Sequence, residues 1–234
     1  MAWAFLGKKG KRKMLKKSLV LSAIAVSALL AGCAPTDFVK PDAQKIAIGK
    51  STWQDVLATS DQEHKPTEAT LKDNDTGKEI RVMTFSYSKG ADFWGMIIQS
   101  HNQNYFFNNN ILIGQGYDSS IDNDSTDFDE NKVPQIKEGV TTKAQVIALM
   151  GNPSGNAIYP MAKAPGDTEL MYLYSHARFA GIATTTEVKS LKVSFNQSGI
   201  ADRVRYNDGR FLGIPGHSPL TFTIGDPNAR QDTQ

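Results

Sequence analysis

Apolar and polar positions alternate with a period of two in several short stretches of the chain. Leu191, Val193 and Phe195 are apolar and are separated by polar residues, which is the pattern of a strand with one buried face. The same reasoning predicts strands over residues 79–88, 103–107, 111–117, 169–175, 191–195 and 200–206. Turn sequences at 108–110 and 196–199 separate neighbouring stretches, so we expect these strands to pair antiparallel.

Two short helices are predicted ahead of these strands. Thr52 with Asp55, and Thr142 with Gln145, each have the spacing of a capping box, which marks the first turn of a helix. The second helix is expected over 142–150, because Gly151 suits a helix C-terminus and a proline follows two residues later. Each set of strands therefore begins with a short helix.

This helix-then-strand pattern occurs twice. The stretch "KIAIGKSTWQDVLA" from Lys45 aligns with "QIKEGVTTKAQVIA" from Gln135 at an offset of 90 residues, and "FNNNILI" aligns with "FNQSGIA" at an offset of 88. Matches that keep their order at nearly constant offset indicate an internal repeat. The sequence predicts an α+β fold made of two tandem units, each a short helical start followed by an antiparallel β-sheet.

A basic and then apolar segment opens the chain. Residues 8–17 carry seven Lys and Arg, and residues 18–32 are apolar or small. This arrangement is typical of a secretory signal peptide, and a second signal-like start lies at Met14. An apolar helix of about 15 residues would span about 22 Å, less than the roughly 30 Å core of a bilayer, which disfavours a transmembrane helix.

Cys33, the single cysteine, directly follows this segment. The sequence "LAGC" at 30–33 resembles the lipobox of bacterial lipoproteins, in which the thiol receives a diacylglyceryl group, cleavage falls before the cysteine, and the new amino group is acylated. The resemblance implies lipidation at Cys33, and Ala34 resembles the outer-membrane sorting class. A buried core cysteine is the alternative, and a signal junction is an unexpected place for one.

Removal of residues 1–32 changes the charge. The whole chain has 26 Lys+Arg and 24 Asp+Glu, a net charge of +2; seven of the basic and none of the acidic residues lie in 1–32, so residues 33–234 carry 19 basic and 24 acidic residues, a net charge of −5. This composition leaves no basic patch that would indicate nucleic-acid binding. A chain with a single cysteine has no internal disulfide.

Six segments follow from these patterns. They are a lipoprotein signal peptide at 1–32, an N-terminal tether at 33–42, a first unit at 43–118, an acidic linker at 119–133, a second unit at 134–207 and a C-terminal tail at 208–234. The acidic run lacks the glycine and the glutamate that a calcium-binding loop requires at positions six and twelve. We therefore expect a solvated linker there rather than a calcium site.

The second unit carries a set of residues with a known counterpart. These are Ile136, Gly139, Thr141, Val146, Gly151 and Pro153. The set resembles the SmpA/OmlA (BamE-like) family of outer-membrane lipoproteins, which includes the smallest lipoprotein subunit of the β-barrel assembly machine. Tandem helix-then-sheet units also resemble the β-lactamase inhibitor protein-like fold. The resemblance implies a lipid-anchored protein that acts by binding other proteins.

No catalytic constellation is present in the sequence. The four histidines lie far apart without metal-ligand spacing, so we expect no enzyme, no cofactor and no metal site. The loops "SKGADFWGMII" and "HARFAGIATTT" hold Phe93, Trp94 and Phe179 at matching places in the two units. Aromatic residues are usually core, and when exposed they anchor protein interfaces. These three are the candidate partner-binding residues.

The sequence thus predicts a non-enzymatic lipoprotein of the outer membrane that faces the periplasm. Its expected role is that of a binding or scaffold module in envelope assembly or maintenance, with the membrane reached through acyl chains on Cys33 and an envelope protein as partner. The alternative is an inhibitor-like protein that binds a periplasmic enzyme through its tandem sheets. A hydrolase is disfavoured because no nucleophile–base pair stands out.

Overall fold

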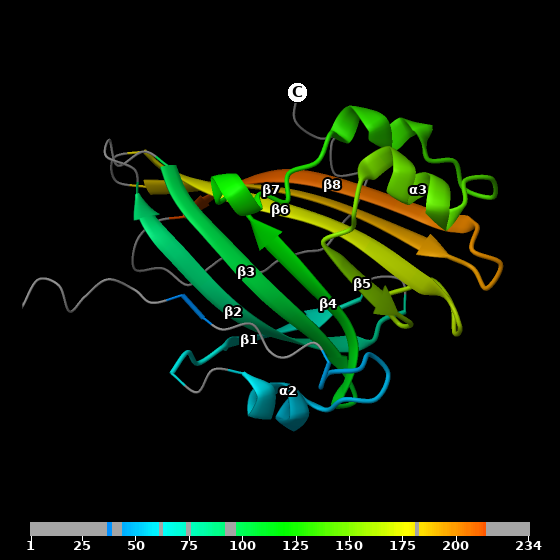
Figure 1. The fold of residues 1–234 in the computed structure, drawn as a ribbon, viewed down its shortest axis with the longest axis horizontal. Coiled ribbons are helices and arrows are strands. Elements are labelled where there is room, and N and C mark those ends of the chain that lie inside the picture. Colours follow the sequence, from blue (N-terminus) through cyan, green and yellow to red (C-terminus); the bar gives the residue numbers. More distant parts are fainter. Residues whose placement is uncertain are drawn as a thin grey trace, which may run out of the picture. The chain divides into compact units, whose positions relative to one another are not determined.

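The computed structural model describes residues 37–38, 44–60, 63–73, 76–91, 97–180 and 183–213. These hold short helices and long strands (Figure 1). In chain order they are α2 (Trp53–Thr59), β1 (Thr67–Lys72), β2 (Glu79–Ala91), β3 (Ile97–Asn108), β4 (Ile111–Ser119), the 3-10 turns η2 (Asp122–Asp124) and η3 (Glu130–Gln135), α3 (Lys143–Met150), β5 (Gly155–Ile158), β6 (Thr168–Ala180), β7 (Ala183–Phe195) and β8 (Ala201–Gly213). No helix in these ranges is long and apolar enough to cross a membrane.

The strands form one antiparallel sheet in the order β1 to β8, with an additional pairing of β3 with β6. The sequence predicted a separate sheet in each unit. Instead β4 pairs with β5 through Gly116 and Gly155, and β3 pairs with β6 through Ile98 and Ala177. The open backbone groups of β4 are satisfied in this way. Helices and antiparallel strands together agree with the α+β class.

Both helices begin as the sequence predicts. The Thr52 hydroxyl accepts from the Asp55 backbone N–H at 3.3 Å, and the Asp55 carboxylate accepts from the Thr52 N–H at 2.8 Å. Thr142 and Gln145 make the same pair of bonds at 3.2 and 2.8 Å. Helix α3 ends at Gly151, whose φ of 86° favours glycine. The capping boxes place both helices at the start of their strands.

Both helices cover the same face of the sheet. The strand residues that contact the helices alternate along each strand with the residues of the opposite face. Val56 of α2 is fully buried against β2, β3 and β4, and Val146 of α3 is fully buried against β6 and β7. The sheet residues in these two cores are Met83, Phe85, Tyr105, Phe107 and Leu112 under α2, and Leu170, Tyr172, Leu191, Val193 and Phe195 near α3.

The opposite face of the sheet holds a third core. It contains Ile80, Val82, Phe106, Ile113, Ala157, Met161 and Met171. Residues from β1 at one end of the strand order and from β7 and β8 at the other line a common pocket beside it. The helix-free face is therefore concave, and its apolar centre joins the first four strands to the last four.

Several predicted boundaries differ from the structure. Strand β8 continues to Gly213, so residues 208–213 are strand rather than tail. Parts of the two predicted loops also belong to strands, namely residues 88–91, 97–98, 176–180 and 183–186. In a long hairpin the backbone N–H and C=O groups pair with each other, which requires no apolar alternation in the sequence.

The predicted linker is packed against the second half of the sheet. Phe128 is buried in the core under η3, and the Thr126 hydroxyl donates to the Leu173 carbonyl at 2.6 Å. The Lys189 ammonium binds Asp127 and Glu130. These contacts fix the segment to the sheet, which the sequence did not predict, while most of its acidic side chains remain exposed as expected of a solvated segment.

Candidate functional site

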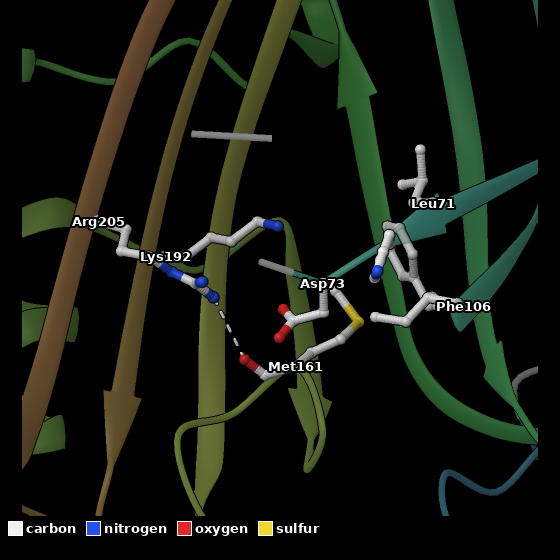
Figure 2. A pocket seen from close by; sticks show the side chains of 8 residues that line it. Leu71, Asp73, Phe106, Met161, Lys192 and Arg205 are labelled. Carbon is white, nitrogen blue, oxygen red and sulfur yellow. Dashed lines mark hydrogen bonds between the residues drawn. The ribbon is translucent and has the colours of Figure 1, made fainter. Parts of the chain in front are cut away.

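A small pocket lies on the concave face, with a basic wall and an apolar wall. Lys192 of β7 and Arg205 of β8 project into it from one side, and Leu71 and Phe106 line the other (Figure 2). Its volume is about 20 Å³, which is room for about one water molecule. The pocket is too small for an organic substrate in this conformation.

Lys192 is the most unusual residue of the pocket. Its side chain is almost completely buried, with 7% of its surface exposed. Burial lowers the pKa of its ammonium group, and the nearby Glu169 carboxylate opposes this shift. In the described part of the chain no hydrogen bond or ion pair reaches the Lys192 ammonium, so its charge is stabilised only from a distance.

Glu169 of β6 is the anion that holds this basic wall together. It is 1% exposed. One of its oxygens accepts from Arg205 Nη2 at 3.3 Å, from Arg203 Nη2 at 3.4 Å and from the Ser194 hydroxyl at 3.0 Å. Two arginines and one hydroxyl thus surround one buried carboxylate, Lys192 lies close enough for its charge to be affected by it, and Asp73 of the β1–β2 connection is a further acidic wall residue. The arrangement can attract an anion, and it offers no nucleophile beside a base.

A second polar group, centred on Asp118 of β4, lies further along the same face. Its carboxylate accepts from Asn102 Nδ2 at 2.8 Å and Asn104 Nδ2 at 3.2 Å, both on β3, and from the Ser175 hydroxyl on β6 at 2.7 Å. Burial raises the pKa of Asp118, and the three hydrogen bonds oppose this shift. Asp118 therefore links the first half of the sheet to the second.

A third site lies on the helix-covered face near the start of β3. His101 is buried, and its Nε2 lies 2.8 Å from Asp37 Oδ1 while its Nδ1 lies 2.8 Å from the Tyr117 hydroxyl. The ring of Phe38 packs edge-on against His101 at 5.2 Å between centroids. Asp37 and Phe38 of the predicted tether are thus held on the sheet. Sequence reasoning missed this contact, because Asp37 and His101 share no motif and only the fold brings them together.

The predicted site residues are only partly described by the structure. Cys33, Phe93 and Trp94 lie outside the described residues. Phe179 lies in β6 and pairs with Thr184, and its side chain is also outside the described set. The strand ends that flank them do meet, since Ile97 pairs with Arg178 and Ile98 with Ala177. Strands β3 and β6, which border the two loops that sequence reasoning matched, are therefore neighbours there.

Among the described residues, no group of three His, Cys, Asp or Glu side chains is arranged to hold a metal ion. His176 instead accepts a hydrogen bond from Arg178 Nε at 3.1 Å and lies 3.5 Å from Glu187. The polar clusters of this part of the chain bind one another and hold strands together.

Comparison with known families gives one match. Residues 126–205 match the model of the outer membrane protein assembly factor BamE domain. This range runs from the acidic segment through α3 to β8, and it confirms the resemblance to SmpA/OmlA proteins that the sequence indicated for the second unit. No curated protein and no solved structure matches the chain.

Proposed function

We propose that this chain, which contains a BamE domain over residues 126–205, is a non-enzymatic binding or scaffold module in outer-membrane assembly or maintenance. The observation that carries the proposal is the family match itself, since it covers the α3-to-β8 part of the fold. The proposed location is the outer membrane, facing the periplasm.

The anchor in this proposal is an acylated Cys33. Its support is the sequence "LAGC" at the end of an apolar segment. Several acyl chains on one residue would make release from a membrane negligible, because each buried CH₂ contributes about 0.8 kcal/mol.

Replacing Cys33 with Ser is expected to prevent formation of the thioether. The protein should then remain as an uncleaved precursor or appear soluble in the periplasm, which membrane fractionation and intact-mass measurement would show. Ala34→Ser is the control, since it leaves the thiol in place. Unchanged mass and membrane location for Cys33→Ser would contradict the anchor.

The proposal extends to a tandem architecture, with residues 43–118 as a second SmpA/OmlA-like unit. Its support is a set of matching bonds. Gly49 N–H donates to the Leu112 carbonyl at 2.7 Å, as Gly139 N–H does to the Ala201 carbonyl at 2.7 Å. Both glycines have positive φ, 82° and 77°, so each turn before its helix requires glycine for the same reason.

The proposed contact surface for a protein partner is formed by Phe93, Trp94 and Phe179. Its support is that β3 and β6, the strands next to the loops that carry these residues, pair at Ile97 and Ile98. The alternative function is an inhibitor-like protein that binds a periplasmic enzyme through the concave face. Capture from detergent-solubilised envelope separates the two, because barrel-assembly subunits support the first and a single soluble enzyme supports the second.

Replacing Trp94 with Ala is expected to weaken partner capture strongly, because an interface tryptophan is often worth about 2 kcal/mol or more. Its effect on unfolding should stay within about 0.5 kcal/mol, as for other surface changes. Melting temperature and capture yield are measured on the same variant, with Trp53→Ala, a change of a buried core residue at the start of α2, as the destabilised control. A large drop in melting temperature for Trp94→Ala would contradict a surface role.

A further inference from the structure

Lys192 lines the pocket of the concave face with an ammonium group that has no partner of its own. The residue is 7% exposed, yet in the described part of the chain no hydrogen bond or ion pair reaches this ammonium. The pocket in front of it has a volume of about 20 Å³ (Figure 2). A buried charge is costly unless a group of opposite charge or a hydrogen-bonding partner compensates it, so we looked for that partner among the pocket residues.

The two carboxylates that act on the charge of Lys192 are Glu169 and Asp73, and other groups already bind both of them. Glu169 Oε2 accepts from two arginines and from the Ser194 hydroxyl. Asp73 Oδ1 accepts from the backbone N–H of Thr76 at 2.8 Å and from its hydroxyl at 2.7 Å. These carboxylates are therefore committed to the walls of the pocket rather than to the ammonium.

The charges around the pocket do not cancel. Those that act on the Lys192 ammonium belong to two carboxylates and two guanidinium groups, Glu169, Asp73, Arg203 and Arg205. Three cations, counting the ammonium, thus face two anions, which leaves a net charge of +1 in a largely buried space. One further negative charge inside the pocket would neutralise the group.

We propose that this pocket binds one monovalent anion of the size of chloride, held by the Lys192 ammonium. The volume of the pocket sets the size, since it has room for about one water molecule and a halide ion is little larger. Sulfate, phosphate or a carboxylate side chain of another protein would need more space. Leu71 and Phe106 form the opposite wall, and such apolar contacts suit a halide better than an oxyanion that needs many hydrogen-bond donors.

The bound anion would hold distant strands together. The pocket takes Leu71 from β1, Phe106 from β3, Lys192 from β7 and Arg205 from β8, so its walls come from both ends of the strand order. An anion between these walls would stabilise the concave face as a whole. The site is independent of the proposed acylation of Cys33 and of the proposed partner surface.

Matched potassium chloride and potassium gluconate solutions test the site in the full-length protein, because gluconate is too large for the pocket. A tenfold excess of chloride over its dissociation constant would raise the melting temperature by about 3–6 °C for a chain of this size. Lys192→Met should lose this difference between the salts, and Lys50→Met, a change of an exposed lysine, should keep it. General salt effects act on all three proteins alike, so the comparison removes them.

Chloride NMR measures the binding directly, because exchange with a protein site broadens the chloride line. We expect broadening by the natural protein and by Lys50→Met, and its loss in Lys192→Met. In gluconate, Lys192→Met should melt no lower than the natural protein, which shows that the variant is folded. An equal response of the natural protein and Lys192→Met to chloride would overturn the site. The absence of line broadening by the natural protein would also overturn it, because the pocket would then hold water only.

Discussion

Replacing Glu169 with Gln is expected to lower the free energy of unfolding by about 3–5 kcal/mol, the cost of leaving buried charge without its partner. The substitution keeps the shape of the side chain and removes only its charge. The guanidinium groups of Arg203 and Arg205, which lie 3.4 and 3.3 Å from Glu169 Oε2, would then share a largely buried space with the Lys192 ammonium and no central anion. Urea unfolding of the two proteins measures the difference.

The matched control is Glu187→Gln on β7. That carboxylate is about one-third exposed and lies 3.5 Å from His176, so its loss should cost less than about 1 kcal/mol. Similar costs for the two substitutions would show that Glu169 is not the anion on which the basic wall depends.

Lys192→Met provides a second, opposite test of the same cluster. Since no hydrogen bond or ion pair from the described residues neutralises the Lys192 ammonium, removing it should raise the free energy of unfolding by about 1 kcal/mol or more and restore part of the loss in Glu169→Gln. Burial lowers the pKa of Lys192 in the folded protein. At pH values between this lowered pKa and the usual lysine pKa, the unfolded chain binds more protons than the folded protein. The free energy of unfolding of the natural protein therefore rises with pH in this range. Lys192→Met should abolish this rise, and destabilisation by Lys192→Met would contradict the model of an unsatisfied charge.

Local features were predictable because each depends on a few neighbouring residues. The capping box of Thr142 and Gln145 and the glycine stop at Gly151 need only the sequence around them, and both are present. The family resemblance of the second unit was visible for the same reason, since its glycines and proline occupy positions where the backbone requires them.

Long-range features were not predictable because strand register creates them. Strand β1 is exposed along almost its whole length and β5 has only four residues, so neither shows an apolar alternation. The pairing of β3 with β6, which joins the two halves, leaves no local signal. His101 and Asp37 are 64 residues apart in the sequence and meet only in the folded protein. Charged residues such as Glu169 and Lys192 are expected to face solvent when they alternate with apolar residues in a strand. In the structure the curvature of the sheet buries them.

The close approach of β4 and β5 leads to the last prediction, Gly155→Ala. Gly155 pairs with Gly116 on one side and Met171 on the other. A Cβ at residue 155 would lie 2.7 Å from the Gly116 Cα and would also clash with the Gln115 carbonyl oxygen. Backbone atoms cannot rotate aside as a side chain does, so we expect a loss of about 3 kcal/mol, the upper end for overpacking.

Gly116→Ala is the control, because it introduces the same methyl group on the other strand of the same pair. There the new Cβ would lie 2.7 Å from Leu173 Cδ1, the end of a flexible side chain that can move, so the expected cost is below about 1 kcal/mol. Thermal unfolding compares the two variants, and amide hydrogen exchange shows whether β4 and β5 open before the rest of the sheet. If both variants unfold at the same temperature, the backbones of β4 and β5 are not held as close as the pairing requires. The Asp118 network and the β3–β6 contact must then join the two halves of the sheet without help from the β4–β5 pair.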